Sequence, residues 1–184
     1  PLDTWRAHFD RWIETPEPKA VMHSSIFFDL RCVHGEASLV EQLAEYACGQ
    51  ARRNRIFRRF MAANVLTHKP PIGFFRRFVQ EQDGSQSEGL NLKHRGIVPI
   101  VDLARMRALE AGITEPNTFR RLQLAVEAGV MNEKDAGSLR DALVLISQLR
   151  LRHQCRQLEE GEAPNNLVPP EELSPLMRRN LKAA

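Results

Sequence analysis

Apolar residues recur at helical spacing through most of this 184-residue chain. Side chains three and four positions apart share one face of an α-helix, so this pattern predicts amphipathic helices. We expect helices at 2–14, 36–50, 54–68, 97–111, 117–128, 132–160 and 171–182, with a further short one from Pro18. The predicted fold class is mainly α, a helical bundle with a small extended or hairpin element.

Three segments do not follow that periodicity. The polar segment 83–89 contains glycine and could join two short strands at 74–80 and 90–94. The apolar run 24–31 fits either a buried strand or a helix end, because periodicity does not separate the two in so short a run. The proline-containing stretch 164–170 is expected to be a linker.

Composition favours a globular domain in a reducing compartment. The chain is 42% hydrophobic and 27% charged, and no apolar run is long enough to cross a membrane. Cys32, Cys48 and Cys155 are odd in number and form no CxxC pair, so we expect reduced thiols and a cytoplasmic protein. The first residues have no signal-peptide pattern, which suggests the middle of a longer protein.

Several polar residues occupy positions on otherwise apolar helix faces. Burying an unpaired polar group costs roughly 2 to 7 kcal/mol, so these groups predict an internal polar network or a cleft. They are Asn64, Asp102, Arg150, His153 and Gln157.

Each of these positions has more than one interpretation. Arg150 and His153 continue the apolar stripe of the 132–160 helix, which either emerges into solvent there or forms a cleft wall. Asp102 needs a cation, and Arg105 one turn away is the local candidate, with Arg150 as a distant one. The Asn64 side chain is expected to cap a backbone group across the helical bundle. We predict that Asp102, Arg150 and His153 lie near one another.

Motifs of common catalytic and metal sites are absent from the sequence. There is no HExxH or HxH pattern, so we predict no metal, and there is no P-loop, GxGxxG or GxSxG. The arginine cluster at 52–59 could approach a phosphate backbone. It lacks the exposed aromatic platform of single-strand binders and any recognition-helix signature, so a nucleic-acid partner is not expected.

Three stretches together resemble one known family. They are Ser25-Ile-Phe-Phe-Asp-Leu-Arg31 with His34-Gly35, Leu90-Asn-Leu-Lys-His-Arg-Gly96 running into 98–105, and Leu149-Arg-Leu-Arg-His-Gln154 followed by Leu173-Ser174-Pro175. The chain is similar to the nucleotidyltransferase substrate-binding domain of bacterial signal-transduction proteins. Those proteins also carry CBS pairs, often a cyclic-nucleotide-binding domain, and a transferase domain similar to that of protein-PII uridylyltransferase.

The resemblance implies a division of the chain. Residues 1–35 would be the tail end of, or the connection to, the transferase domain, with 26–30 as an edge strand of its sheet, and residues 36–184 the helical substrate-binding domain. Transfer in that superfamily uses a glycine-serine turn and an Asp-x-Asp pair that binds two metal ions. This chain has neither. We therefore expect no catalytic residue and no cofactor here, with Mg²⁺ and a nucleoside triphosphate serving the intact transferase.

The resemblance and the helical patterns give two sets of candidate residues. The expected substrate-binding set is Lys93, Arg95, Arg150, His153 and Gln154. The expected structural or cleft-lining set is Asp29, Arg31, His34, Asn64, Asp102 and Arg105. His94 and Arg95 stand in the reverse of the family's order, so which of Lys93, His94 and Arg95 points into the cleft stays open.

Two functions are compatible with these features. The chain is either the substrate-binding wall of a nucleotidyltransferase or a regulatory interaction module that couples CBS or cyclic-nucleotide-binding domains to a partner. In both, the expected partners are upstream transferase and regulatory domains of the same protein, a protein acceptor is one candidate, and no membrane is involved.

Overall fold

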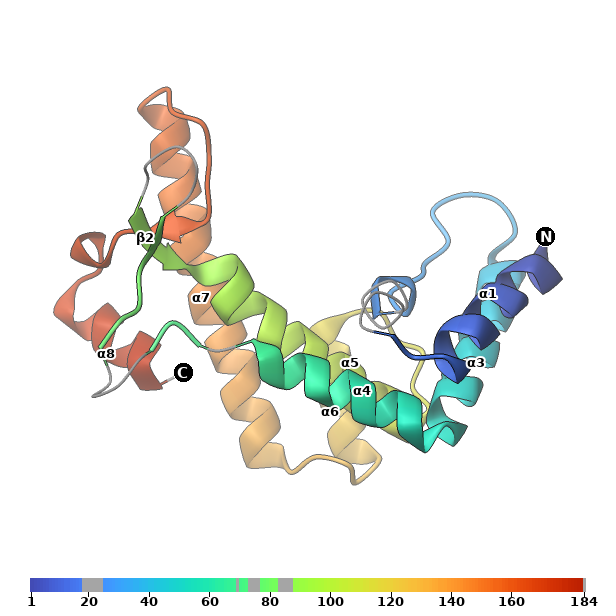
Figure 1. Cartoon of the computed structure of the whole chain (residues 1–184). Coiled ribbons are helices and arrows are strands. Elements are labelled where there is room, and N and C mark those ends of the chain that lie inside the picture. Colours follow the sequence, from blue (N-terminus) through green and yellow to red (C-terminus); the bar gives the residue numbers. More distant parts are fainter. Residues whose placement is uncertain (18–24, 69, 73–76, 83–87, 184) are drawn as a thin grey trace. The chain divides into compact units, whose positions relative to one another are not determined.

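The computed structural model describes residues 1–17, 25–68, 70–72, 77–82 and 88–183. It is mainly helical with one small antiparallel sheet, which confirms the predicted fold class (Figure 1). The chain forms two compact units, and each is built from two separated stretches. Unit 1 comprises Pro1–Thr67 and Val101–Ala136, and unit 2 comprises His68–Ile100 and Gly137–Ala184.

Unit 1 is built from helices whose bounds lie close to the expected ones. The described helices are α1 (Leu2–Glu14), α3 (Ala37–Arg53), α4 (Arg55–Thr67), most of α5 (Val98–Ala111) and α6 (Thr118–Glu127). Their apolar faces meet in a core made of Phe9, Ile13, Leu43, Ala47, Cys48, Ala51, Phe57, Met61 and Leu109. Burial of these side chains is the main force that orients the helices.

Asparagines cap the starts of α6 and α7, and a glycine follows the end of α6, at bounds close to the expected ones. The Asn117 side chain accepts a hydrogen bond from the Arg120 N–H at the start of α6 (3.1 Å). Gly129, just after α6, has φ +70°, a left-handed conformation that glycine adopts without strain. Asn132 then accepts from the Asp135 N–H (2.8 Å) at the start of α7 (Glu133–Glu159).

The inward face of α6 includes a charged side chain. Leu122 is buried, whereas Phe119 on the same helix is 42% exposed. Arg121 is only 2% exposed. Its burial depends on acceptors supplied by another part of unit 1, described below.

The described part of the apolar run, residues 25–31, begins with a helical turn and contains no strand. Residues 25–27 are helical and the Asp29 N–H donates to the Ile26 carbonyl (3.2 Å), so the expected edge strand at 26–30 is wrong. Phe27 and Phe28 pack against the core of unit 1. A helical turn can bury these rings without hydrogen bonds to a neighbouring strand. The short helix expected from Pro18 begins outside the described residues.

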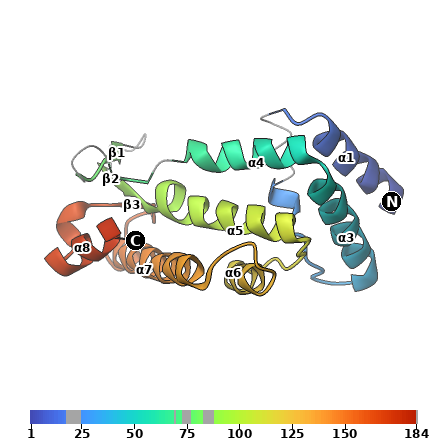
Figure 2. The ribbon, with the colours of Figure 1, turned by 90° about the horizontal axis from the view of Figure 1, so that it is seen from below.

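Unit 2 combines a small sheet with α7 and α8 (Pro175–Ala183). The strands β1 (Glu81–Gln82), β2 (Glu88–Asn91) and β3 (Leu167–Val168) pair antiparallel in the order β1-β2-β3 (Figure 2). A Cβ on Gly89 would lie 2.8 Å from the Leu167 carbonyl carbon, so β2 needs glycine there. The unit's core consists of Leu90, Leu92, Ile100, Ala142, Leu143, Ile146, Leu149, Val168, Leu173 and Leu181.

The sheet corrects several sequence expectations. The hairpin exists, but its first strand is at 81–82 and not at 74–80; Phe78 forms an isolated bridge to Ile72, and residues 73–76 and 83–87 lie outside the described part. The expected linker 164–170 contains β3, because Leu167 and Val168 are buried against β2.

The expected final helix is also divided. Its first part is the 3₁₀-helix η3 (Pro170–Glu172), and α8 starts afresh at Pro175. Proline has no N–H to donate and is tolerated only in the first turn of a helix. The Ser174 hydroxyl accepts from the Met177 N–H (3.2 Å) at this new start.

Candidate functional site

The polar end of α7 is covered by protein and does not emerge into solvent. His153 and Gln157 are 6% and 4% exposed, and Arg150 is half-buried. They continue the face of Leu143, Ile146 and Leu149, which lies in the core of unit 2. The interpretation that this helix end is solvated is therefore wrong, and the face needs polar partners.

The segment 165–172 supplies those partners. The Asn165 N–H donates to Gln157 Oε1 (2.9 Å), and the Asn165 side-chain oxygen lies 3.2 Å from His153 Nε2. The other ring nitrogen of His153 lies 3.1 Å from Glu172 Oε2. Both nitrogens of the buried imidazole are thus engaged, which fixes the ring between α7 and this segment.

Asn166 links α7 to the end of β2. Its side-chain oxygen accepts from Arg150 Nε (2.5 Å) and lies 3.5 Å from Gln154 Nε2, which also donates to the Asn165 carbonyl (3.1 Å). The Asn166 carbonyl accepts from the Leu92 N–H (3.2 Å), the residue that precedes Lys93. Arg150, His153 and Gln154 therefore meet around two asparagines.

The Lys93–Arg95 stretch forms a π-helix, η2 (Lys93–Ile97), which the sequence pattern did not predict. Lys93 and His94 are exposed, whereas Arg95 is half-buried and bonds Glu81 of β1. A hydrogen bond from Asn91 (2.9 Å) lowers the pKa of Glu81 most, and Arg95 lowers it further against the opposing effect of burial. Wide π-turns occur often at functional sites.

These contacts define the polar cluster of unit 2, which contains Arg150, His153, Gln154, Asn165, Asn166 and Glu172. The structure joins Arg150, His153 and Gln154 directly. Arg95 contacts Glu81, and Lys93 is exposed next to the segment that Asn166 holds. The binding roles of all five candidates stay predictions.

A second cluster, in unit 1, surrounds Asp29. The Asp29 carboxylate accepts from Arg105 Nε (3.1 Å) and Arg121 Nη1 (2.6 Å), and Arg121 Nη2 donates to the Phe28 carbonyl (2.9 Å). Arg105 also bonds Asp102, its predicted local partner. Two carboxylates face two guanidinium groups, so the charges balance. We call Asp29, Asp102, Arg105 and Arg121 the ion cluster.

Charge and burial oppose each other in the ion cluster. Burial raises the pKa of Asp29, but hydrogen bonds and charges from Arg105 and Arg121 outweigh it and hold that pKa below its usual value. Burial lowers the pKa of Arg105, and Asp29 and Asp102 more than compensate. For Arg121 burial prevails and its pKa is lowered, although Asp29 opposes this. The carboxylate of Asp29 stays ionised through the physiological range.

The remaining candidates lie apart from these clusters. Arg31 and His34 are exposed, and Asn64 is half-buried, with its carbonyl accepting from the Thr67 hydroxyl (2.6 Å). Asp102 belongs to unit 1, while Arg150 and His153 belong to unit 2. The predicted convergence of these three residues stays a prediction.

Sequence reasoning missed Arg121, Asn165, Asn166 and Glu172 as partners. Arg121 stands in an arginine pair that resembles a solvated face, and its acceptor is far away in the sequence. The one available signal was its position beside Leu122 on α6. The asparagines lie in a stretch that reads as a linker.

The three cysteines differ in environment. Cys48 is buried with its thiol donating to the Ile113 carbonyl (3.7 Å), and burial raises its pKa to about 11. Cys32 and Cys155 are exposed, and the described cysteines are free thiols, as expected.

Within the described ranges, no three His, Cys, Asp or Glu side chains are grouped so as to hold a metal ion. None of the described helices is long and apolar enough to span a membrane.

Comparison with family models identifies a relationship that covers most of the chain. The model of a family described as "Putative nucleotidyltransferase substrate binding domain" matches residues 55–184. Searches of the curated proteins and of the solved structures found no match.

Proposed function

Because this chain belongs to the family of putative nucleotidyltransferase substrate binding domains, we propose that it binds substrate for a transferase similar to protein-PII uridylyltransferase. In this proposal the chain serves a signal-transduction protein and does not catalyse transfer by itself. The family match over residues 55–184 is the observation that carries the proposal.

The polar cluster of unit 2 supports a binding role. All five expected substrate-binding residues lie inside the matched range. Arg150, His153 and Gln154 are held by Asn165 and Asn166, so their side chains are oriented before any substrate arrives. Such preorganisation lowers the entropy lost on binding. Lys93, exposed beside the cluster, offers a mobile charge for an anionic group.

The proposal includes a protein context. An upstream transferase domain would supply the Asp-x-Asp carboxylates, Mg²⁺ and the nucleoside triphosphate, and residues 1–35 would form its tail end or the connection to it. CBS or cyclic-nucleotide-binding domains would regulate it, in the cytoplasm, and a protein would be one candidate acceptor.

The test uses the intact protein of which this chain is a part. It is incubated with Mg²⁺, each of the common nucleoside triphosphates labelled at the α-phosphate, and cell extract as the source of acceptor. We expect label on an acceptor with the intact protein and none with this chain alone. Lys93→Ala should raise the KM for the acceptor about tenfold with little change in kcat, since a binding contact is lost.

Arg152→Ala is the matched control. Arg152 is an exposed cation on the same helix as Arg150, so its removal should leave KM unchanged. Labelling by this chain alone would contradict the proposal, and so would an intact protein whose acceptor KM does not respond to removal of this chain.

A further inference from the structure

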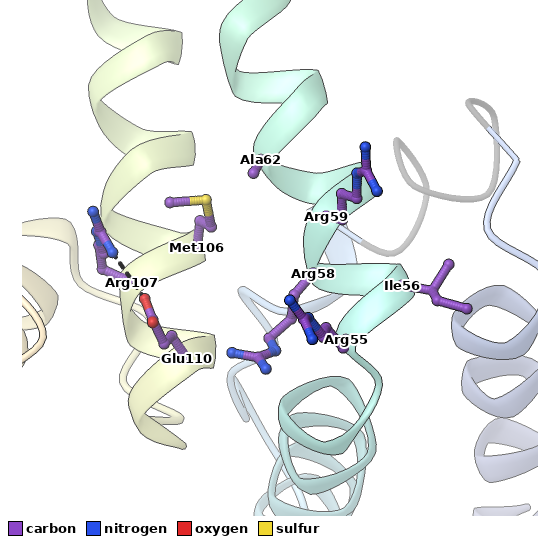
Figure 3. A pocket seen from close by; sticks show the side chains of 8 residues that line it. All are labelled: Arg55, Ile56, Arg58, Arg59, Ala62, Met106, Arg107 and Glu110. Atoms are coloured by element: carbon purple, nitrogen blue, oxygen red, sulfur yellow. Dashed lines mark hydrogen bonds and ion pairs between the residues drawn. The ribbon is translucent and has the colours of Figure 1, made fainter.

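A cavity of about 570 Å³ lies between α4 and α5, within unit 1. It is lined by Arg55, Ile56, Arg58, Arg59, Ala62, Met106, Arg107 and Glu110. Figure 3 shows the guanidinium groups of Arg55 and Arg58 extending from α4 toward α5, with Ile56 pointing away. Its volume is within the range of small-molecule sites, about 300 to 1,000 Å³.

The cavity carries an excess of positive charge. Arg107 pairs with Glu110 (2.9 Å), and that carboxylate is the one acidic group on the wall. Among the described residues, Arg55, Arg58 and Arg59 take part in no ion pair. Arg58 Nε is buried and has no hydrogen-bond partner there. A buried donor without an acceptor is costly in a native protein and needs an explanation.

The helix dipole of α4 makes this cluster of arginines still less favourable when no anion is bound. The three arginines lie in the first two turns of α4, where the helix dipole is positive, and the first turn contains no acidic residue. Arg58 and Arg59 follow Arg55 by three and four positions, so each places a like charge next to Arg55 on the helix surface. An anion bound in the cavity would relieve both effects and supply an acceptor for Arg58.

We propose that this cavity binds the phosphate chain of a small ligand, of the kind a nucleoside triphosphate carries. The inference rests on the proposed function, because it assigns a second anion site to the same domain. Arginine side chains suit phosphate oxygens because each guanidinium presents a planar fork of donors. Met106 and Ala62 offer apolar surface beside the arginines.

The experiment is calorimetric titration of this chain with inorganic triphosphate, with each common nucleoside triphosphate and with the unphosphorylated nucleosides. We expect triphosphate and the nucleotides to bind, the nucleosides not to bind, and the affinity to fall as salt screens the site. Arg55→Gln with Arg58→Gln should weaken binding at least about tenfold. Glu110→Gln should bind as tightly as the parent or more tightly.

Two further variants complete the design. Arg58→Lys keeps the charge but loses the fork, so it should fold normally and bind more weakly. Arg152→Gln removes an exposed arginine from unit 2 and should change nothing.

Each contrary outcome is distinct. Absence of triphosphate binding, or equal binding by the parent and the double variant, overturns this inference. Loss of binding in Lys93→Ala or Arg150→Ala, but not in the double variant, also overturns it, because the anion then binds at the polar cluster of unit 2. The labelling assay on the intact protein would still decide the proposed function separately.

Discussion

Asp29 connects separate parts of unit 1 through one carboxylate. It follows the helical turn at 25–27 and contacts Arg105 of α5 and Arg121 of α6. Arg121 is 2% exposed, and its Nε has no hydrogen-bond partner among the described residues. Asp29 is the main partner that compensates this buried charge.

Replacing Asp29 should be strongly destabilising. In Asp29→Ala, Arg121 becomes a buried charge whose main partner is missing, a change that costs about 3 to 5 kcal/mol. The lower end applies because the Asp29 side chain is 35% exposed. Urea unfolding of the single variants and of Asp29→Ala with Arg121→Met measures the coupling. The double variant should be more stable than the sum of the single losses implies.

Asp3 provides the control for Asp29. It also pairs with an arginine, Arg6, but its side chain is 96% exposed. Asp3→Ala should change the free energy of unfolding by about 0.5 kcal/mol or less. Strictly additive losses for Asp29 and Arg121 would show that the ion cluster does not act as a unit.

At the scale of elements, Asn54 performs two tasks between α3 and α4. Its side-chain oxygen accepts from the Phe57 N–H (2.9 Å), which caps α4, and its amide donates to the Ile13 carbonyl at the end of α1 (2.9 Å). Asn117 caps α6 in the same way, but its described side-chain bond is local. Asn117 therefore caps a helix only, whereas Asn54 caps a helix and also hydrogen-bonds another helix.

The two caps should differ in strength. We expect Asn54→Ala to cost about 2 kcal/mol and Asn117→Ala about 1 kcal/mol, since the first also loses a hydrogen bond to α1. Thermal unfolding followed by circular dichroism measures both. Equal losses in the two variants would mean that the bond to Ile13 adds no net stability.

Local patterns predicted the elements well, and distant partners limited the rest. The helix ends at Asn117, Gly129 and Asn132 depend on neighbouring residues, so sequence alone located them. β3 is two residues long, and its only reason to be extended is β2, far away in the chain. No local pattern encodes such a pairing.

In the candidate site, too, the sequence predicted what depends on local pattern and missed the distant partners. The helical pattern placed His153 and Gln157 on the core-facing side of α7, and their burial confirms it. The pattern gave no indication of Asn165 and Asn166 as their partners. The partner of Arg121 was missed for the reason that applies to β3, because its acceptor Asp29 lies in a distant segment of the chain.

At the scale of the molecule, each unit holds a carboxylate with a lowered pKa, Asp29 in unit 1 and Glu81 in unit 2. Both are ionised in the folded and unfolded states above their ordinary pKa values of about 3.9 and 4.3. Their stabilisation is therefore complete at neutral pH. As the pH falls, the unfolded state binds protons first, and stability is lost until the folded pKa is passed.

We therefore expect the urea midpoint to be flat near neutrality and to fall below about pH 5. Glu81→Gln should reduce that acid dependence. Glu88→Gln, which removes an exposed carboxylate from the neighbouring strand, should not. A urea midpoint that is unchanged down to pH 3, or two glutamate variants with the same acid dependence, would contradict this role of the lowered carboxylate pKa values.

The interleaving of the two units has a consequence for the order of biosynthesis. A ribosome releases the chain from its N-terminal end, so a unit can fold only when its last stretch has emerged. Unit 1 is complete at Ala136, whereas unit 2 needs β3 and the core residue Leu181. During translation, β2 must wait for β3 with the apolar side chain of Leu90 uncovered, after the last stretch of unit 1 has already emerged. This interval is when the nascent protein is most exposed to chaperones and to aggregation.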